Sequence, residues 1–193
     1  LYGDTHPYGH PEIGTEASTK AMTRDDMEKF WKQNFVPNNA ALVVSGQITR
    51  DELRPLVEKA FGKWEKGTPA AQTTGEPSTS TARLVLVDKP GAPQTQLRVA
   101  SIGAPRSTPD YAALQVMNEN LGGLFSSRIN LNLREAHGYT YGASSQFVFR
   151  RAAGPFAVAT GVRTDVTAPA LAETAKEIAK MREGVSADEL TLA

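Results

Sequence analysis

Residues 122–145, GGLFSSRINLNLREAHGYTYGASS, concentrate glycine, arginine, histidine and tyrosine between segments of ordinary core-building sequence. Within this stretch Arg134 and Tyr141 lie seven residues apart, with Gly138 and Gly142 close by. A guanidinium and a phenol can donate hydrogen bonds to a peptide carbonyl or an oxyanion, but neither group activates water by itself. The stretch therefore predicts half of an active site.

The first part of this stretch fits two kinds of secondary structure. RINLNLR, residues 128–134, alternates as a strand does, yet its apolar positions also fall on one stripe of a helix. In a helix, Asn130 and Arg134 share a face, and Arg134 occupies the last turn. Its charge is then favourable against the helix dipole by about 0.3–1 kcal/mol, whatever it does for function. Both structures stay open from the pattern, and the dipole role is the structural alternative to a functional Arg134.

The second part of the stretch has the composition of a strand. Tyr139, Tyr141, Ala143 and Ser145 fall on one face of such a strand. Aromatic residues are good strand formers, so the tyrosines alone indicate no function. His137, at the junction of helix and strand, is more typical of a capping or surface residue than of a general base. From the residues alone we predict only an α+β domain with a polar constellation.

Around this stretch, the second half of the chain mixes strands with helices. Two strands joined by a Pro-Gly turn come first, followed by two helical segments separated at Gly122 and Gly123. Two further strands and a helix with an apolar stripe complete it. The predicted strands are residues 83–88, 94–102, 139–149 and 154–162. This order favours an α+β fold, an antiparallel-rich mixed sheet with helices packed on one face in a two-layer sandwich.

The first 65 residues predict a separate unit. Thr23 begins a helix with acidic residues in its first turn, and Thr49 with Glu52 forms a capping box at the start of another. The apolar run at 38–45 has the length of a strand, and the apolar face of the second helix indicates packing on a sheet. Residues 66–82 are rich in Thr, Ser, Pro and Gly, which predicts a linker. The expected units are therefore 1–65, the linker 66–82, and 83–193.

Composition excludes several classes of protein. Of the 193 residues, 40 % are apolar, which is enough for a folded core. Lys+Arg and Asp+Glu both number 21, so no net charge favours nucleic acid or acidic membranes. No apolar run approaches the roughly 18 residues of a membrane span. The absence of cysteine excludes disulfides and thiolate zinc sites.

Both ends of the sequence predict a piece of a longer protein. It starts without an initiator methionine, and it stops within what reads as a new helix. Near the start, His6 and His10 lie in the loop HPYGHP, whose prolines exclude a helix. A zinc site needs three or four ligands, so these residues favour a surface loop fixed by prolines. No metal ligand is expected in this chain.

The stretch FSSRINLNLREAHGYTYGASS resembles the second domain of the pitrilysin/insulinase-like zinc peptidases. This family includes the mitochondrial processing peptidases and respiratory core subunits. HPYGHPEIGT, FVPNNAALVVSGQI and ELRPLVEKAFGKW resemble the end of the family's first domain, so the resemblance covers essentially the whole chain. It implies that residues 1–65 are the C-terminal part of a first peptidase-like domain. Residues 83–193 are then a second such domain, truncated at its C-terminal end.

The resemblance also implies how the active site is divided. The family's inverted zinc motif, H-x-x-E-H, is absent from this sequence. The second domain contributes an Arg and a Tyr seven residues apart, which selects Arg134 and Tyr141. Tyr141 would donate to the scissile carbonyl or its oxyanion, and Arg134 would hold a neighbouring carbonyl of the peptide substrate. Further substrate contacts are expected from Tyr139, Gly122, Gly123 and Asn130, and the choice between the two phenols stays open.

The implied cofactor is zinc, held by the complete enzyme or by a partner subunit, so this chain alone is expected to hydrolyse nothing. The implied partner is a zinc-bearing family member in a homo- or heterodimer, without nucleic acid. Two alternatives stay open: a non-catalytic structural or assembly subunit of the same family, and a free-standing binding module. Among bacterial compartments, periplasm and cytoplasm both stay open, with the periplasm favoured.

Overall fold

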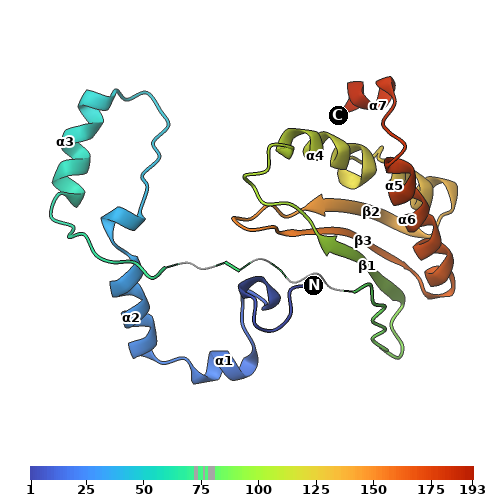
Figure 1. Cartoon of the computed structure of the whole chain (residues 1–193), viewed down its shortest axis with the longest axis horizontal. Coiled ribbons are helices and arrows are strands. Elements are labelled where there is room, and N and C mark those ends of the chain that lie inside the picture. Colours follow the sequence, from blue (N-terminus) through green and yellow to red (C-terminus); the bar gives the residue numbers. More distant parts are fainter. Residues whose placement is uncertain (72–73, 76, 78–80) are drawn as a thin grey trace. The chain divides into compact units, whose positions relative to one another are not determined.

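The computed structural model describes residues 1–71, 74–75, 77 and 81–193. Its internal contacts divide the chain into two units, which are described separately (Figure 1). One unit contains Leu1–His10 together with Thr74–Ala193, and the other contains Pro11–Thr73. This grouping differs from the expected boundary at the N-terminus, and part of the expected linker 66–82 lies outside the described residues.

The first ten residues attach to the later unit through tyrosine side chains. The hydroxyl of Tyr2 donates to the carbonyl of Ala153 at 2.9 Å, and the hydroxyl of Tyr8 accepts from the amide of Ala152 at 3.2 Å. The guanidinium carbon of Arg150 lies 4.8 Å from the centre of the Tyr8 ring. Hydrogen bonds and a cation–π contact therefore attach the first ten residues to residues 150–153, whereas the sequence alone indicated only a surface loop.

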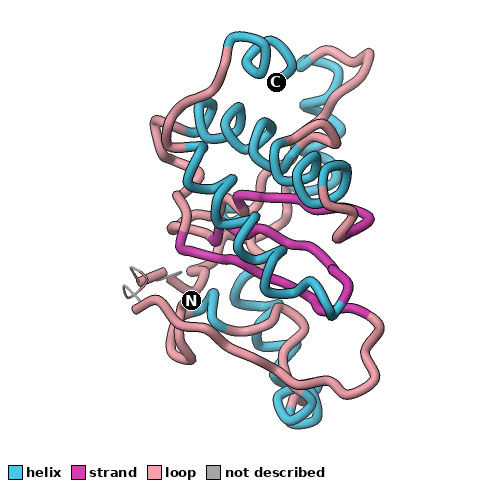
Figure 2. Tube along the Cα trace, turned by 90° about the vertical axis from the view of Figure 1, so that its right-hand side faces the viewer, coloured by secondary structure: helices cyan, strands magenta, loops and turns pink. Residues whose placement is uncertain are grey.

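A three-stranded antiparallel sheet forms the centre of this unit. Its strands are β1 (Gln94–Ile102), β2 (Thr140–Phe147) and β3 (Pro155–Arg163), in the order β1-β3-β2. Figure 2 shows the strands lying side by side as one sheet. Alternate residues of the central strand β3 are buried, as expected for a strand with one face against a core.

Helices cover one face of this sheet (Figure 1). Helix α4 (Tyr111–Asn118) continues into the π-helical segment η3 (Glu119–Gly123), and α5 (Arg128–Asn130) continues into a second π-helical segment, η4 (Leu131–Ala136). A 3-10 turn, η5 (Thr164–Val166), leads from β3 into α6 (Thr167–Met181), and α7 (Ala187–Leu192) follows. The α+β fold class with helices on one face is thereby confirmed.

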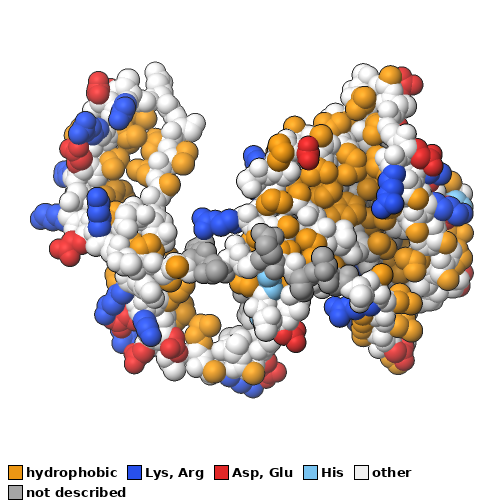
Figure 3. Space-filling model, viewed as in Figure 1, with side chains coloured by type: hydrophobic (Ala, Val, Ile, Leu, Met, Phe, Trp, Pro, Cys, Tyr) orange, Lys and Arg blue, Asp and Glu red, His pale blue; other side chains and the backbone are white. Residues whose placement is uncertain are grey.

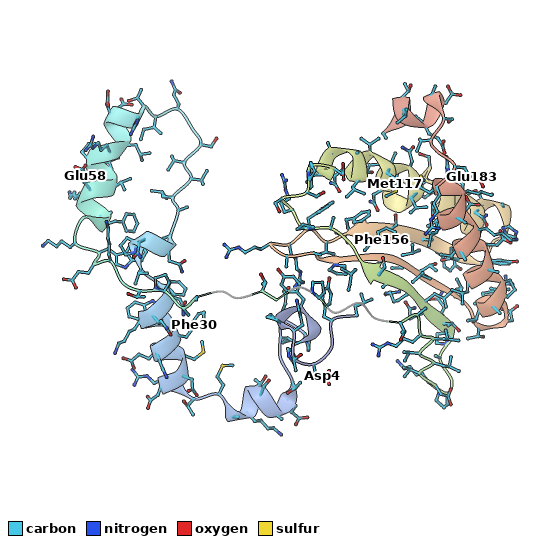
Figure 4. The ribbon with its side chains drawn as sticks, viewed as in Figure 1. Asp4, Phe30, Glu58, Met117, Phe156 and Glu183 are labelled. Carbon is cyan, nitrogen blue, oxygen red and sulfur yellow. The ribbon has the colours of Figure 1, made fainter. Side chains whose placement is uncertain are left out.

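The core lies between these helices and the sheet. Leu121, Ile129 and Leu133 come from the helical side, and Val158 and Val162 come from β3. Figure 4 labels Met117 on α4 and Phe156 on β3, which both pack against this cluster. Since Ile129 and Leu133 are four residues apart and both fully buried, residues 128–134 follow the helical stripe and not the strand alternation.

The predicted strand at residues 83–88 is wrong. These residues form no strand, and Leu84, Val85, Leu86 and Val87 are between 67 and 86 % exposed. A strand needs a neighbouring strand to take its amides and carbonyls, and the structure places none beside this segment. Its apolar composition is therefore not sufficient to make it a strand.

The Pro11–Thr73 unit contains three helices, α1 (Glu16–Ala21), α2 (Arg24–Asn34) and α3 (Arg50–Phe61). The predicted start of α2 at Thr23 and the predicted capping box of α3 are confirmed. In both cases a threonine hydroxyl accepts from the amide three residues later, while the acidic side chain at that position accepts from the threonine amide.

Two further predictions for this unit are wrong. The run at 38–45 forms no strand, because it begins in a 3-10 turn, η2 (Pro37–Asn39), and continues without regular structure. Helix α3 buries no residue and packs on no sheet within the described part of the unit. Large apolar side chains such as Phe30, Trp31 and Val43 stay exposed, as the hydrophobic atoms at the surface in Figure 3 also show. Amphipathic helices bury their apolar face only where another layer is present, and this unit supplies none.

Candidate substrate-contact site

Arg134 lies in η4, just before the chain turns into β2. The widened turn is visible in its hydrogen bonds: the amide of His137 donates to Asn132 at 3.2 Å, and that of Tyr139 donates to Leu133 at 2.8 Å. Gly138, with φ of +61°, makes the left-handed turn that ends the helix. Arg134 is therefore in the last turn, where its charge also favours the helix dipole.

The side chain of Arg134 is stacked and only partly exposed. Its guanidinium carbon lies 4.4 Å from the centre of the Phe125 ring, and its Nε is 3.4 Å from the carboxylate of Glu135. Stacking engages the face of a guanidinium and leaves its in-plane N–H groups able to donate. Phe125 thus orients Arg134 without consuming the donors that a substrate carbonyl would need.

Tyr141 lies on a β-bulge. Thr140 pairs with Val162 and Ala143 pairs with Thr160, so Tyr141 and Gly142 together oppose the single residue between those two partners. The side chain of Tyr141 is 90 % exposed, whereas Ala143 is buried. The expected single face for the residues of this strand is therefore wrong, because the extra residue interrupts the alternation.

Tyr139 occupies a different environment from Tyr141. It is half-buried and packs against the core cluster, with its ring centre 4.9 Å from that of His137. The Nδ1 of His137 is 2.9 Å from the carbonyl of Asn132, which is a capping arrangement. Of the two tyrosines, Tyr141 is the more exposed, and a substrate contact of either stays a prediction.

Asn130 brings the helix of Arg134 and the strand of Tyr141 together. This buried side chain donates from Nδ2 to the carbonyl of Phe125 at 2.7 Å, and its Oδ1 accepts from the amide of Ala143 at 3.0 Å. Arg134 is one turn further along the helix, and Ala143 is two residues beyond Tyr141. Asn130 acts here as a connector within the domain, and its contact with substrate stays a prediction.

The glycine pair after α4 has two different surroundings. A Cβ on Gly122 would lie 2.4 Å from the amide nitrogen of Ser145 and 2.5 Å from its hydroxyl. That hydroxyl donates to Asn118 at 2.9 Å, and Asn118 in turn donates to the Ser145 carbonyl at 3.2 Å. Gly122 therefore allows the helix to approach β2 closely. A substrate contact of Gly122 or Gly123 stays a prediction.

Three polar residues of this region escaped the sequence analysis: Asn118, Thr140 and Thr160. Asn118 and Thr160 are buried, and Thr160 stands between Val158 and Val162 on the inward face of β3. Thr160 interrupts the apolar alternation of Val158 and Val162, and this interruption was visible in the sequence. The partners of Thr160 lie 18 or more positions away, so their identity was not readable from spacing.

His6, in the loop near the start of the chain, does not fit the role of a zinc ligand. The Nε2 of His6 lies 2.9 Å from the carbonyl of Gly75, and its Nδ1 accepts from the amide of Tyr8 at 3.0 Å. An Nε2 bonded to a carbonyl carries the proton, so neither ring nitrogen has a lone pair left for a metal. Across the described ranges, no three His, Cys, Asp or Glu side chains gather as a metal site would require.

The surface around Arg134 and Tyr141 is open. Two surface depressions lie along α2 and α3, and residues 122–145 line neither of them. Among the helices of the described residues, none has the length and apolarity to cross a membrane. Fold and site together define an α+β domain that presents an arginine and a tyrosine on an open surface.

Comparison with known proteins identifies the family. The family model described as the peptidase M16 inactive domain matches residues 21–193. The chain therefore belongs to the peptidase M16 family and contains its inactive domain. This confirms the resemblance to pitrilysin/insulinase-like zinc peptidases.

Individual relatives agree with this assignment. An uncharacterised zinc protease of Mycobacterium leprae is 33 % identical over 149 residues, which cover 75 % of this chain and 33 % of that protein. A probable mitochondrial-processing peptidase subunit beta of Arabidopsis thaliana is 28 % identical over 60 % of this chain and 22 % of its own length. The chain thus spans less than half the length of these relatives.

A solved structure has the same fold. The crystal structure of a peptidase M16 inactive domain from Pseudomonas fluorescens superposes with a TM-score of 0.91 at 29 % identity. The match covers 98 % of this chain and 46 % of that chain. The likeness therefore extends over both units described above.

Proposed function

We propose that this chain supplies the substrate-carbonyl and oxyanion clamp of a zinc-dependent peptidase. Tyr141 donates from its phenol to the scissile carbonyl or to the oxyanion that forms from it, and Arg134 holds a neighbouring carbonyl of the peptide. The zinc is held outside this chain, by another segment of the protein or by a partner subunit. By itself the chain hydrolyses nothing.

The observation that carries the proposal is the different exposure of the two tyrosines. The bulge presents Tyr141 almost fully to solvent, while Tyr139 packs against the core. If Tyr141 were present only because tyrosine favours strands, no bulge would be needed to expose its side chain. Arg134, stacked on Phe125, lies on the helix that Asn130 joins to the same strand.

The chemistry of these two groups suits the proposed role. An ionised guanidinium and a neutral phenol both donate hydrogen bonds and carry no basic lone pair at neutral pH, so they stabilise developing negative charge without competing for the proton. Hydrogen-bond donors that are already in place stabilise an oxyanion more than they stabilise the ground-state carbonyl, because negative charge grows on the carbonyl oxygen toward the transition state. Tyr141 therefore acts on the rate more than on binding, whereas Arg134, on a neighbouring carbonyl, acts by binding and positioning the peptide.

The test is peptidase activity after mixing the full-length form of this protein with a zinc-bearing family member from the same source. Tyr141→Phe is expected to lower kcat/KM by roughly 10²–10³-fold, as for the loss of one oxyanion donor. Arg134→Ala is expected to lower kcat/KM at least about a hundredfold as well, through the loss of substrate positioning. The matched control is Tyr139→Phe, which removes the half-buried phenol and should leave activity within a few-fold. Equal effects of the two tyrosine variants, or no effect of either, would contradict the clamp.

A second candidate function is a structural or assembly role. The family model is named for an inactive domain, and the Arabidopsis relative is named as one subunit of a peptidase. Under this alternative, substitution of Arg134 or Tyr141 leaves the activity of the mixture unchanged. Removal of this chain, in contrast, destabilises the partner. The same variants therefore separate the two functions.

A further inference from the structure

The hydroxyl of Thr160 lies in a position where packing alone calls for valine. On the inward face of the central strand β3, its neighbours Val158 and Val162 belong to the core, and Thr160 itself is only 5 % exposed. Valine and threonine have nearly the same shape, and a buried hydroxyl is unfavourable unless it is hydrogen-bonded. The hydroxyl of Thr160 therefore has a role other than packing.

Its bonds lead to the bulge that carries Tyr141. The Thr160 hydroxyl is 3.0 Å from the carbonyl of Gly142 and 3.0 Å from the hydroxyl of Thr140. The Thr140 hydroxyl lies 2.7 Å from the carbonyl of Gly161 and accepts from the amide of Gly142 at 3.1 Å. The Thr140 hydroxyl is also 2.9 Å from the carbonyl of Gly142. With one proton on each hydroxyl, Thr160 donates to Gly142 while Thr140 donates to Gly161, or Thr160 donates to Thr140 while Thr140 donates to Gly142. Both arrangements connect Thr160 to the bulge.

The amide and the carbonyl of Gly142 are thus both bonded to threonine side chains. A bulge removes one residue from the ladder, and its amide and carbonyl need other partners. Here the two hydroxyls supply them, and one hydroxyl comes from the rigid centre of the sheet. The position of Gly142 fixes the backbone direction of Tyr141, the residue before it.

We infer that Thr160 and Thr140 are positioning residues that lock the bulge and thereby aim Tyr141 at the substrate. The inference rests on the proposed function of Tyr141. It adds two residues to the site that do not touch substrate and that act through the backbone of Gly142.

The principal test is Thr160→Val, with Thr160→Ser as the matched rescue, in the mixing assay described above. Thr160→Val keeps the shape of the core, so the domain is expected to stay folded, with a urea midpoint lowered by no more than the loss of one hydrogen bond implies. Loss of one buried hydrogen bond from the lock should lower kcat about tenfold with little change in KM. Thr160→Ser should restore most of the rate, because it restores the donor. Thr140→Val should be more damaging, since Thr140 also accepts the Gly142 amide.

A double mutant distinguishes positioning of Tyr141 from a general effect. Adding Thr160→Val to Tyr141→Phe is expected to cause no further loss, because the group being aimed is already gone. Additive losses would overturn the inference, and so would full activity of Thr160→Val. If Tyr141→Phe is itself neutral, the proposed function fails, and the lock is judged by spectroscopy alone.

The spectroscopic readout does not depend on activity. In nuclear magnetic resonance spectra, Thr160→Val should speed hydrogen exchange of the Gly142 amide and shift the ring signals of Tyr141. The ring signals of Tyr139, which pack against the core, serve as the internal reference. Unchanged exchange at Gly142 together with unchanged Tyr141 signals would show that Thr160 does not hold the bulge.

Discussion

At the scale of single residues, Gly122 and Gly123 are adjacent in sequence but meet different neighbours. A Cβ on Gly122 meets the backbone and hydroxyl of buried Ser145, whereas a Cβ on Gly123 meets the carboxylate of Glu119, 2.7 Å away. A carboxylate at the end of a flexible side chain can move aside, and a buried backbone cannot. The two positions therefore form a matched pair.

We expect Gly122→Ala to destabilise the domain by about 1–3 kcal/mol, the usual effect of overpacking a core. Gly123→Ala should stay within about 0.5 kcal/mol of the wild type, because alanine is the better helix former and the clash is relieved by rotation of Glu119. Urea unfolding followed by circular dichroism measures both. Equal stability of the two variants would contradict the close approach of Gly122 to β2.

At the scale of elements, an ion pair between Arg128 and Glu189 joins α7 to the domain. Arg128 in α5 donates from Nη2 to the carboxylate of Glu189 at 2.8 Å and also to the carbonyl of Gly184 at 2.9 Å. The same carboxylate accepts from the amide of Ser186, which begins α7. These bonds lower the pKa of Glu189 from 4.5 to about 2, and the largest effect comes from the hydrogen bonds of the Arg128 guanidinium.

A carboxyl group whose pKa is lower in the folded protein stabilises it above the ordinary pKa and stops doing so as the pH falls through the lowered value. We therefore expect α7 to stay docked at pH 4.5 and to detach progressively as the pH approaches 2. Backbone chemical shifts of residues 187–192 during an acid titration measure this. Glu189→Gln is the control, because it should loosen α7 at neutral pH and remove the acid step. A titration in which α7 and the sheet lose structure together would argue against this separate step.

At the scale of the whole molecule, the two units differ in how much they bury. Apolar side chains of the unit with the sheet form a core, whereas those of α2 and α3 stay largely exposed. Both tryptophans of the chain, Trp31 and Trp64, lie in the Pro11–Thr73 unit and are 58 and 40 % exposed. Tryptophan fluorescence therefore reports on that unit alone.

We expect the isolated chain to show the emission of water-exposed indole, with iodide quenching close to that of free N-acetyltryptophanamide. Addition of urea should change this emission little, while circular dichroism follows the unfolding of the sheet and its helices. Trp31→Phe and Trp64→Phe assign the signal to α2 and to the segment that follows α3. A blue-shifted emission that resists iodide would mean that another surface covers this unit.

The sequence by itself determined what depends on neighbours a few positions away. The helix starts at Thr23 and Thr49 follow from hydrogen bonds that span three residues, and the α+β class follows from the order of periodic segments. The choice of Arg134 and Tyr141 came from the resemblance to the family, and their role stays a prediction.

Only the tertiary structure decided the rest. Residues 40–45 and 83–88 have the composition of strands, but a strand requires a partner to complete its hydrogen bonds, and sequence composition does not supply one. Residues 128–134 are helical because Ile129 and Leu133 both reach the core. The exposure of Tyr141 depends on a bulge bonded to Thr160, 18 positions from Gly142, and contacts over such separations leave no local pattern in the sequence.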